Sequence, residues 1–466
     1  MVMKNSIILI FGITGDLSKR KLIPGLYRLL ANGKIDQVRV IGAAIEDYQK
    51  ASEVLDQAKD FIADLDLVVW QKLVEKFSYC RVDINEASDF VKLAKLVEFE
   101  RRQYNLTDQI LVYCAVFELL YVQLTAQLSQ VGIIKRMLSD VNSWCRVVYE
   151  KPFGHNYDSV YQLNQSILQF LHEEQIYRVD HYLAKEIVGN IAFVRFTNRI
   201  FEPLWNKFSI DSVQITLDES IDIEGRGGYY ERYGIIKDMV QNHVLQLMAL
   251  IAMGTPKSLR GHDMQSAKSQ ILQKIVCEDG ILGQYIGYLG EEGVATDSKT
   301  PTFAALKFAI NDSRWYGVPF YVRTGKVMPS KLTKIVIKFK DMHCLLAKNC
   351  PPGANVLTIS IYPKGGFDLE INAKKPGTND QVMPVKMSYC YDCQFVPQAP
   401  NAYESVLSEI MQGETTFAVR IDEIEAAWQI SDQIDLLNLP VYQYAKNSMG
   451  PRELNEFNQK HQLIWI

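Results

Sequence analysis

The chain has 466 residues, of which 48% are hydrophobic and 22% are charged, and its formal net charge is -4. This length predicts two or three domains. The small negative charge excludes a general electrostatic attraction to nucleic acid or to anionic membranes. No apolar run approaches the ~20 residues that a transmembrane helix needs. We therefore expect neither nucleic acid nor a membrane as a partner, and a phosphorylated ligand would need a local cluster of basic side chains.

The N-terminal apolar run and the cysteines bear on location and on metal binding. The run Ser6–Phe11 ends in a glycine turn without a small-residue cleavage site, which favours a buried strand over a signal peptide. Eight cysteines are too few for a disulfide scaffold. Cys390 and Cys393 leave zinc open as a minor alternative, but the spacing of Cys344 and Cys350 upstream does not match a zinc knuckle. We expect no metal and a reducing cytoplasm.

The N-terminal part of the chain alternates strand and helix patterns. Ser6–Phe11 is typical of a buried strand, Leu17–Ala31 has apolar residues at helical spacing, and Val38–Ala44 is a second strand pattern. A strand, a glycine turn, a helix and a strand form a βαβ unit, which predicts a parallel sheet. Further strands fit Ile110–Val116 and Arg146–Tyr149. Residues 1–177 are therefore predicted to form a Rossmann-like, doubly wound dinucleotide-binding domain.

From Ser212 onward the pattern changes to strands that follow one another without helices, which predicts a mostly antiparallel sheet. The predicted strands are Ser212–Glu219, Thr302–Ile310, Leu332–Phe339, Asn355–Tyr362, Phe367–Asn372 and Val382–Cys393. The predicted helices are Ile235–Met253, Tyr403–Met411 and Ile421–Leu437. Residues 178–466 are thus predicted to form an α+β domain for substrate binding and dimerisation.

The segment Arg178–Glu186 brings an acid, an imidazole, a phenol and an amine close together in sequence. If it is helical, His181 and Lys185 lie four residues apart and share one face. Such a pair can hold a phosphate dianion, and Asp180 beside it can orient a catalytic base. The alternative is the ion-paired start of a surface helix.

Three other segments carry chemistry, each with a structural alternative. The turn Gly12–Leu17 follows a strand and opens a helix, which suits a pyrophosphate or an ordinary strand-to-helix turn. Glu150–Gly154 closes a strand of the same sheet and either aims Lys151 at a ligand or leaves it solvated. Asp238–His243 leads into an apolar helix, so His243 is either a general base or a satisfied core histidine.

These segments together resemble the signature segments of glucose-6-phosphate dehydrogenases, in the order and near the spacing of that family. Four further segments extend the resemblance to the C-terminal tail: Arg195–Phe201, Gly225–Tyr230, Tyr321–Lys326 and Ser448–Pro451. The resemblance is weakest between Val40 and Val141. It implies oxidation of glucose 6-phosphate at C1 to 6-phosphogluconolactone, the first step of the oxidative pentose phosphate pathway, with NADP as the cofactor. It also implies a homodimer or a dimer of dimers.

The resemblance also assigns roles to single residues. His243 matches the catalytic base and Asp180 its orienting carboxylate, an arrangement that would fix the tautomer and stabilise the imidazolium. The positions that match substrate-binding residues are His181, Tyr182, Lys185, Glu219, Asp238, Lys326, Lys331 and Lys21. The positions that match cofactor-binding residues are Gly12, Thr14, Gly15, Asp16, Leu17 and Lys151.

Two departures from the family pattern concern the cofactor. The family usually has an arginine after the second strand that binds the 2′-phosphate of NADP, and here Ile45 takes its place, followed by Glu46 and Asp47. Acids there suit a free ribose hydroxyl, which leans toward NAD or dual use unless Lys19 or Lys50 replaces the arginine. The loop 114–118 also lacks the proline that the family commonly has.

Two other functions remain open at this point. One is a sugar oxidoreductase of the glucose–fructose oxidoreductase type, which shares the domain plan and a Glu-Lys-Pro-like motif but lacks the paired segments around Asp180 and His243. The other is a non-catalytic ligand sensor on the same fold, which only the altered cofactor region favours.

Overall fold

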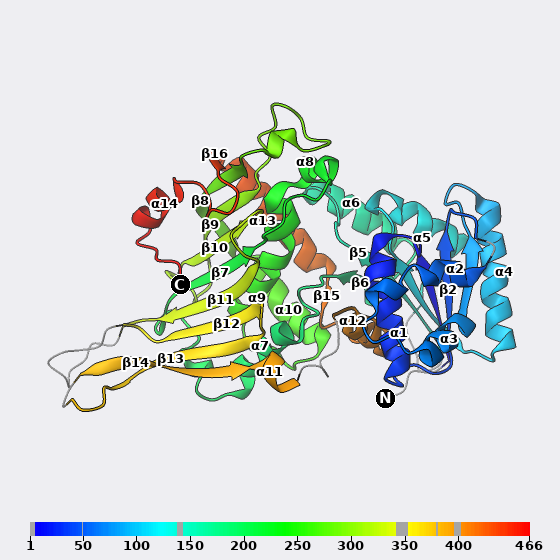
Figure 1. Ribbon diagram of the computed structural model, residues 1–466, viewed down its shortest axis with the longest axis horizontal. Coiled ribbons are helices and arrows are strands. Elements are labelled where there is room, and N and C mark those ends of the chain that lie inside the picture. Colours follow the sequence, from blue (N-terminus) through cyan, green and yellow to red (C-terminus); the bar gives the residue numbers. More distant parts are fainter. Residues whose placement is uncertain (1–4, 49, 138–142, 342–352, 379–380, 396–401) are drawn as a thin grey trace. The chain divides into compact units, whose positions relative to one another are not determined.

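The computed structural model describes residues 5–48, 50–137, 143–341, 353–378, 381–395 and 402–466. It divides into two compact units (Figure 1). Unit 1 comprises Met1–Lys185, Arg260–Gln265 and Pro400–Asp422, and unit 2 comprises the remaining segments, Glu186–Leu259, Ser266–Ala399 and Glu423–Ile466. This division differs from the predicted boundary at 177/178, because two segments from the second half of the chain pack with the first.

Unit 1 is built on a seven-stranded sheet in the order β15-β6-β5-β4-β1-β2-β3. Its strands are β1 (Ser6–Phe11), β2 (Val38–Ala44), β3 (Phe77–Arg81), β4 (Asp108–Cys114), β5 (Ser143–Glu150), β6 (Ile176–Val179) and β15 (Ala418–Val419). β1 to β6 pair in parallel, and β15 pairs antiparallel with β6. The order 3-2-1-4-5-6 is that of doubly wound dinucleotide-binding folds, so the predicted fold class of this part is confirmed.

The helices of unit 1 connect these strands. They are η1 (Ser18–Leu22), α1 (Ile23–Ala31), α2 (Ala51–Asp56), η2 (Lys59–Phe61), α3 (Leu67–Glu75), α4 (Ala87–Gln103), η3 (Glu118–Leu120), α5 (Tyr121–Gln130), α6 (Tyr157–Leu168), η4 (Glu173–Gln175) and α12 (Ala402–Gln412). α1 packs on α3 and α12, whereas α5 packs on α4 and α6. All six residues of β1 are buried, which explains its continuous apolar run.

Unit 2 contains a nine-stranded sheet in the order β14-β13-β12-β11-β7-β10-β9-β8-β16. Its strands are β7 (Ile210–Asp218), β8 (Ile275–Tyr285), β9 (Phe303–Ile310), β10 (Phe320–Gly325), β11 (Leu332–Phe339), β12 (Val356–Tyr362), β13 (Gly366–Lys374), β14 (Val382–Cys390) and β16 (Val441–Tyr444). β10 pairs in parallel with β7, and β16 with β8, while the other neighbours are antiparallel. The predicted large, mostly antiparallel sheet is confirmed.

The helices of unit 2 include one that is buried along its whole length. They are α7 (Glu186–Thr197), η5 (Glu202–Leu204), α8 (Gly227–Ile235), η6 (Ile236–Val244), α9 (Leu245–Ala252), α10 (Gly261–Leu272), whose first turn belongs to unit 1, η7 (Tyr288–Gly290), α11 (Tyr391–Phe395), α13 (Ile421–Leu436), which begins at the end of unit 1, and α14 (Leu454–Lys460). Every residue of α9 is buried, and this helix packs against α7 and η6. The Arg195 guanidinium donates to the carbonyls of Leu250 and Met253 at 2.6 and 2.8 Å, which satisfies the last turn of that helix.

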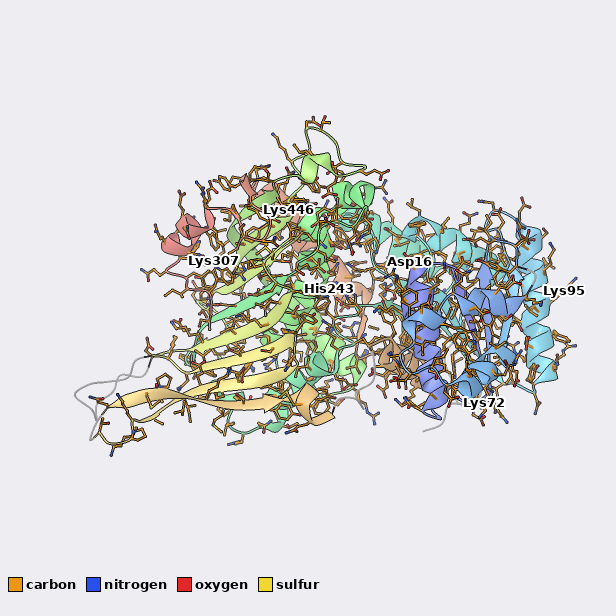
Figure 2. The ribbon with its side chains drawn as sticks, in the orientation of Figure 1. Asp16, Lys72, Lys95, His243, Lys307 and Lys446 are labelled. Atoms are coloured by element: carbon orange, nitrogen blue, oxygen red, sulfur yellow. A yellow bond between two sulfur atoms is a disulfide. The ribbon has the colours of Figure 1, made fainter. Side chains whose placement is uncertain are left out.

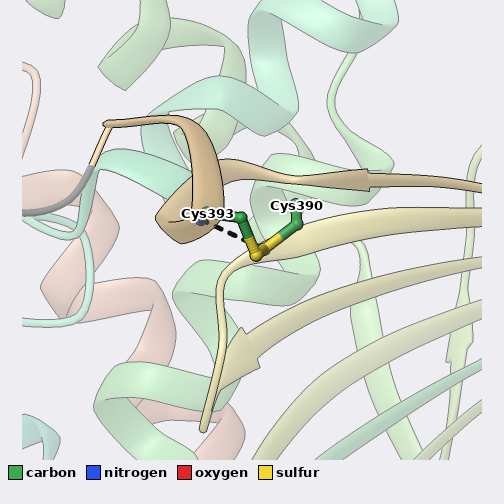
Figure 3. Close-up of a disulfide and its surroundings, with 2 residues drawn as sticks. All are labelled: Cys390 and Cys393. Carbon is green, nitrogen blue, oxygen red and sulfur yellow. Dashed lines mark hydrogen bonds between the residues drawn. A yellow bond between two sulfur atoms is a disulfide. The ribbon is translucent and has the colours of Figure 1, made fainter.

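The region around Cys390 differs from the sequence prediction. The predicted strand Val382–Cys393 ends at Cys390, where α11 begins and the chain turns. A disulfide joins Cys390 and Cys393 (Figure 3). Because the two sulfurs are bonded to each other, neither is a thiolate that could bind zinc, and the minor zinc alternative is corrected. Cys344 and Cys350 lie outside the described residues. Among the described helices, none combines the length and the hydropathy that crossing a membrane requires.

Candidate active site

The glycine turn after β1 has the geometry that a dinucleotide requires. Gly12 has a φ of 75°, and a Cβ there would lie 2.1 Å from the carbonyl oxygen of Ala115. The Ser18 hydroxyl donates to the Gly12 carbonyl at 2.9 Å, which closes the turn onto η1. The turn lies at the carboxyl end of β1, between β2 and β4, where ligands of doubly wound sheets bind. Thr14, Gly15, Asp16 and Leu17 lie in or beside this turn (Asp16 is labelled in Figure 2), and its bare backbone fits a pyrophosphate.

The end of β2 carries acids beside this turn. The Thr14 hydroxyl donates to a carboxylate oxygen of Glu46 at 3.0 Å. Ile45, in the position of the family's arginine, has 55% of its surface exposed. The second departure, the loop 114–118, contacts the motif after β5, because the Gly154 amide donates to the Glu118 carboxylate at 2.6 Å.

Glu150 ends β5 as a buried carboxyl next to Lys151. Its side chain accepts a hydrogen bond from Tyr113, and its carbonyl accepts one from the Tyr121 hydroxyl at 2.7 Å. Tyr403, from α12, also contacts the carboxyl. Burial raises the pKa of Glu150 to about 7, and the hydrogen bond from Tyr113 opposes this rise. Glu150 has no role among the predicted site residues, although it directly precedes Lys151 in the sequence.

Glu150 should make folding stability depend on pH. Because the folded-state pKa of about 7 lies above the ordinary value of 4.5, the folded chain holds a proton that the unfolded chain has released between these pH values. The stabilisation that this group contributes is complete below its ordinary pKa of 4.5. It is lost as the pH rises through the folded-state pKa of about 7. We expect the free energy of unfolding in urea to fall from pH 5 to pH 8 by up to about 3 kcal/mol from this group. Glu150→Gln should remove that part of the decrease, and an equal decrease in both proteins would contradict the assignment.

The segment after β6 gathers four of the predicted residues in unit 1. Asp180 is buried, and its carboxylate accepts from the Tyr182 amide at 2.8 Å. The His181 and Tyr182 rings lie 5.0 Å apart, and the Lys185 ammonium lies 4.0 Å from the centre of the Tyr182 ring. The segment is a series of turns, and α7 begins only at Glu186. The conditional prediction of a shared helical face is therefore corrected: the Asp180 side chain caps a turn, and the Tyr182 ring lies near both basic groups.

In unit 2, a buried lysine joins two of the predicted carboxylates. Lys326 follows β10, and its ammonium bonds to the carboxylate of Glu219 at the end of β7 and lies 3.3 Å from that of Asp238. The Tyr229 hydroxyl donates to Asp238 at 3.3 Å. Lys326 is 2% exposed. A buried ammonium is stable only with such partners, so these three residues form one hydrogen-bonded group.

His243, labelled in Figure 2, lies on η6. This helix packs on β7 and β10. η6 is a π-helix, a form that is frequent at functional sites. Because its hydrogen-bonded turn spans five residues, Asp238 and His243 lie one turn apart. His243 is 1% exposed, and its amide donates to the Asn242 side chain at 2.6 Å. The predicted run of polar residues into a buried helix is confirmed.

Three predicted lysines are less enclosed. Lys331 is exposed, and its ammonium lies 5.0 Å from the centre of the Tyr362 ring. Lys21 is exposed on η1. Lys151 directly follows β5, and the peptide bond between Lys151 and Pro152 is cis.

A doubly wound unit with a glycine turn, together with a second unit in which a buried histidine shares a π-helix with an aspartate paired to lysine, is typical of a dinucleotide-dependent oxidoreductase. Two models of one family match the chain: "Glucose-6-phosphate dehydrogenase, NAD binding domain" over residues 9–190 and "Glucose-6-phosphate dehydrogenase, C-terminal domain" over residues 192–466. The chain belongs to the glucose-6-phosphate dehydrogenase family.

Individual relatives agree with this assignment. The chain is 35% identical to glucose-6-phosphate 1-dehydrogenase of Bacillus subtilis, over 99% of this chain and 98% of the relative. It is 36% identical to the enzyme of Chlamydia pneumoniae, over 98% of this chain and 95% of the relative. A solved glucose-6-phosphate dehydrogenase in complex with its substrate glucose 6-phosphate is 29% identical, with a TM-score of 0.92 and coverage of 100% of this chain and 99% of that one.

Proposed function

We propose that the chain oxidises glucose 6-phosphate at C1 to 6-phospho-glucono-1,5-lactone, with hydride transfer to NADP, as the first step of the oxidative pentose phosphate pathway. The observation that supports this most strongly is the family match across both domains. Neither the glucose–fructose oxidoreductase type nor a non-catalytic sensor is favoured. The test is NADPH formation from glucose 6-phosphate by the purified chain, with the lactone identified as the product. If no NADPH forms, the proposal is contradicted and the non-catalytic ligand sensor becomes the better account.

The chemical step requires a base and a hydride acceptor. The nicotinamide of the bound cofactor supplies the acceptor. We assign His243 as the base that removes the proton from O1, and Asp180 as the carboxylate that holds its tautomer and stabilises the imidazolium. Both are buried, and a low-polarity surrounding strengthens such charge interactions.

The remaining residues position the sugar phosphate. We assign the phosphate to His181, Tyr182 and Lys185, because charge-assisted bonds are the strong ones. Glu219 and Asp238 would accept bonds from sugar hydroxyls. Since the Lys326 ammonium contacts both carboxylates, it fixes their orientation. Lys331 and Lys21 complete the set as more peripheral cations.

The cofactor site combines the glycine turn with Lys151. Gly12, Thr14, Gly15, Asp16 and Leu17 would face the pyrophosphate, and Lys151 would lie near the nicotinamide. NADP is the expected cofactor. Because Ile45, Glu46 and Asp47 follow β2, we propose a weaker preference for NADP than is usual in the family, with measurable NAD activity.

Ile45→Arg should tighten NADP selectively, by on the order of 1.5–3 kcal/mol if its planar fork reaches the 2′-phosphate. Binding of NADP and NAD would be measured side by side, together with steady-state kinetics for both. Ile45→Gln, which is polar but uncharged, serves as the control and should change neither. A wild-type chain with strong NADP selectivity that Ile45→Arg leaves unchanged would mean that the phosphate is bound elsewhere.

We further propose a homodimer or a dimer of dimers in the cytoplasm. The nine-stranded sheet ends at β14, where Met383 and Met387 are 38% and 59% exposed. Exposed apolar side chains on an end strand favour association. Light scattering of the purified chain would give the mass of the assembly.

A further inference from the structure

The strand beside β2 carries an arginine at the same edge of the sheet. β2 and β3 are parallel, and Ala44, the last residue of β2, pairs with Arg81, the last residue of β3. The next amide, that of Val82, donates to the Ala44 carbonyl at 2.8 Å. The carboxyl ends of such strands border the ligand crevice, and the ribose of a dinucleotide is recognised at the end of the second strand. Arg81 therefore leaves the sheet directly beside the ribose position.

The direction of the Arg81 side chain follows from its neighbour on the strand. Tyr79 lies two residues earlier, so both side chains extend from the same face of β3. The Tyr79 hydroxyl donates to the carbonyls of Ala44 and Glu46 at 3.2 and 2.5 Å. The Arg81 Nε lies 3.7 Å from a carboxylate oxygen of Asp47. Both side chains thus lie against the short loop that begins with Ile45, where the family has its arginine.

The guanidinium is held loosely. Its distances of 3.7 Å to Asp47 and 3.5 Å to Asp89 exceed those of a good N–H···O bond. Asp89 also receives the Lys92 ammonium at 2.9 Å and the Asp83 amide at 3.2 Å, so it keeps partners if Arg81 moves. The Arg81 side chain is 44% exposed. It can turn toward an anion without leaving a buried carboxylate alone.

We propose that Arg81 is the residue of this chain that recognises the 2′-phosphate of NADP, from β3 instead of from the end of β2. The proposal rests on the proposed function, in which NADP is the cofactor. A guanidinium offers a planar fork that matches phosphate oxygens. Glu46, the other acid of this loop, does not compete for Arg81, because its carboxylate accepts from the Thr14 hydroxyl and is drawn toward the glycine turn. Arg81 then supplies the charge that Ile45 does not.

The test is direct binding of NADP and of NAD by isothermal titration calorimetry, without sugar substrate, so that the readout does not depend on turnover. Arg81→Gln should raise the Kd for NADP by about ten- to a hundredfold and leave the Kd for NAD unchanged. Arg81→Lys, which keeps the charge but loses the fork, should fall between. The matched control is Arg102→Gln, which removes the same charge from a 79% exposed side chain of α4 and should change neither Kd.

A second variant keeps the test decisive if Arg81→Gln does not fold. Asp47→Asn removes the carboxylate nearest to Arg81 Nε and should tighten NADP while leaving NAD unchanged; unchanged NADP binding would overturn the proposal. Equal weakening of NADP and NAD by a folded Arg81→Gln, or no weakening, would also overturn it. If the wild-type chain prefers NADP and Arg81→Gln does not change that preference, the proposal for Arg81 is refuted but the proposed function is not. A chain that binds neither dinucleotide would refute the proposed function as well.

Discussion

His243→Asn is expected to lower kcat by about 10²–10⁴-fold, the usual consequence of losing a general base, while the binding of glucose 6-phosphate changes little. The reason is the position of His243 on η6, one turn from Asp238 and 1% exposed, where the imidazole is enclosed as a general base that takes the O1 proton would be. Steady-state kinetics and the dissociation constant for the substrate would be measured for both proteins.

His461→Asn is the matched control. His461 is another enclosed histidine of unit 2, and its ring bonds to Asp279 at 2.6 Å. It lies on the loop after α14, and no catalytic role is assigned to it, so kcat should persist in this variant. A His243→Asn enzyme with nearly normal turnover would move the base to another residue.

Removing one basic group from the turn after β6 is expected to raise the KM for glucose 6-phosphate strongly. Charge-assisted bonds to a phosphate contribute roughly 1.5–3 kcal/mol each, so Lys185→Ala or His181→Asn should each raise KM by about ten- to a hundredfold. Free glucose, which lacks the phosphate, should lose little. The measurement is kcat/KM for the two sugars with each variant.

Lys207→Ala provides a comparison for the Lys185 variant. The Lys207 ammonium also lies near an aromatic ring, 5.4 Å from the centre of Phe208, but in a segment without a predicted site residue. It should leave both substrates unaffected. If Lys185→Ala lowers kcat/KM equally for glucose and for glucose 6-phosphate, this ammonium does not bind the phosphate.

The elements with strong local patterns were predictable from sequence. Ser6–Phe11, Val38–Ala44 and Leu332–Phe339 were predicted with the bounds that the structure has, because continuous burial or clear turns delimit them. β3 was missed, since its burial is mixed and it has no uninterrupted apolar run. β10 was read only as part of a motif, because its six residues, although all buried, include Arg323 and Thr324.

Long-range packing was not predictable from local patterns. β15 is two residues long and pairs with β6 across more than half of the chain, and this pairing brings Pro400–Asp422 into unit 1. No periodicity marks such a short strand. The division at 177/178 therefore followed the change in pattern and not the contacts.

The site shows the same division. Residue types in motifs pointed to His243, Asp180 and the lysines. The way in which Lys326 joins Glu219 and Asp238 depends on the pairing of β7 with β10, which no single segment encodes. Arg81 was overlooked because only the register of β2 against β3 places it beside Ile45. The helix considered for Arg178–Glu186 does not form, and the Asp180 side chain instead caps a turn by accepting from the Tyr182 amide.

The most direct test of the central claim uses glucose 6-phosphate that carries deuterium at C1. If the chain transfers a hydride from C1, the NADPH that it forms carries the deuterium, the other product is 6-phosphogluconolactone, and His243→Asn forms both far more slowly. NADPH without the label, or no NADPH from this substrate with the wild-type chain, would contradict the account.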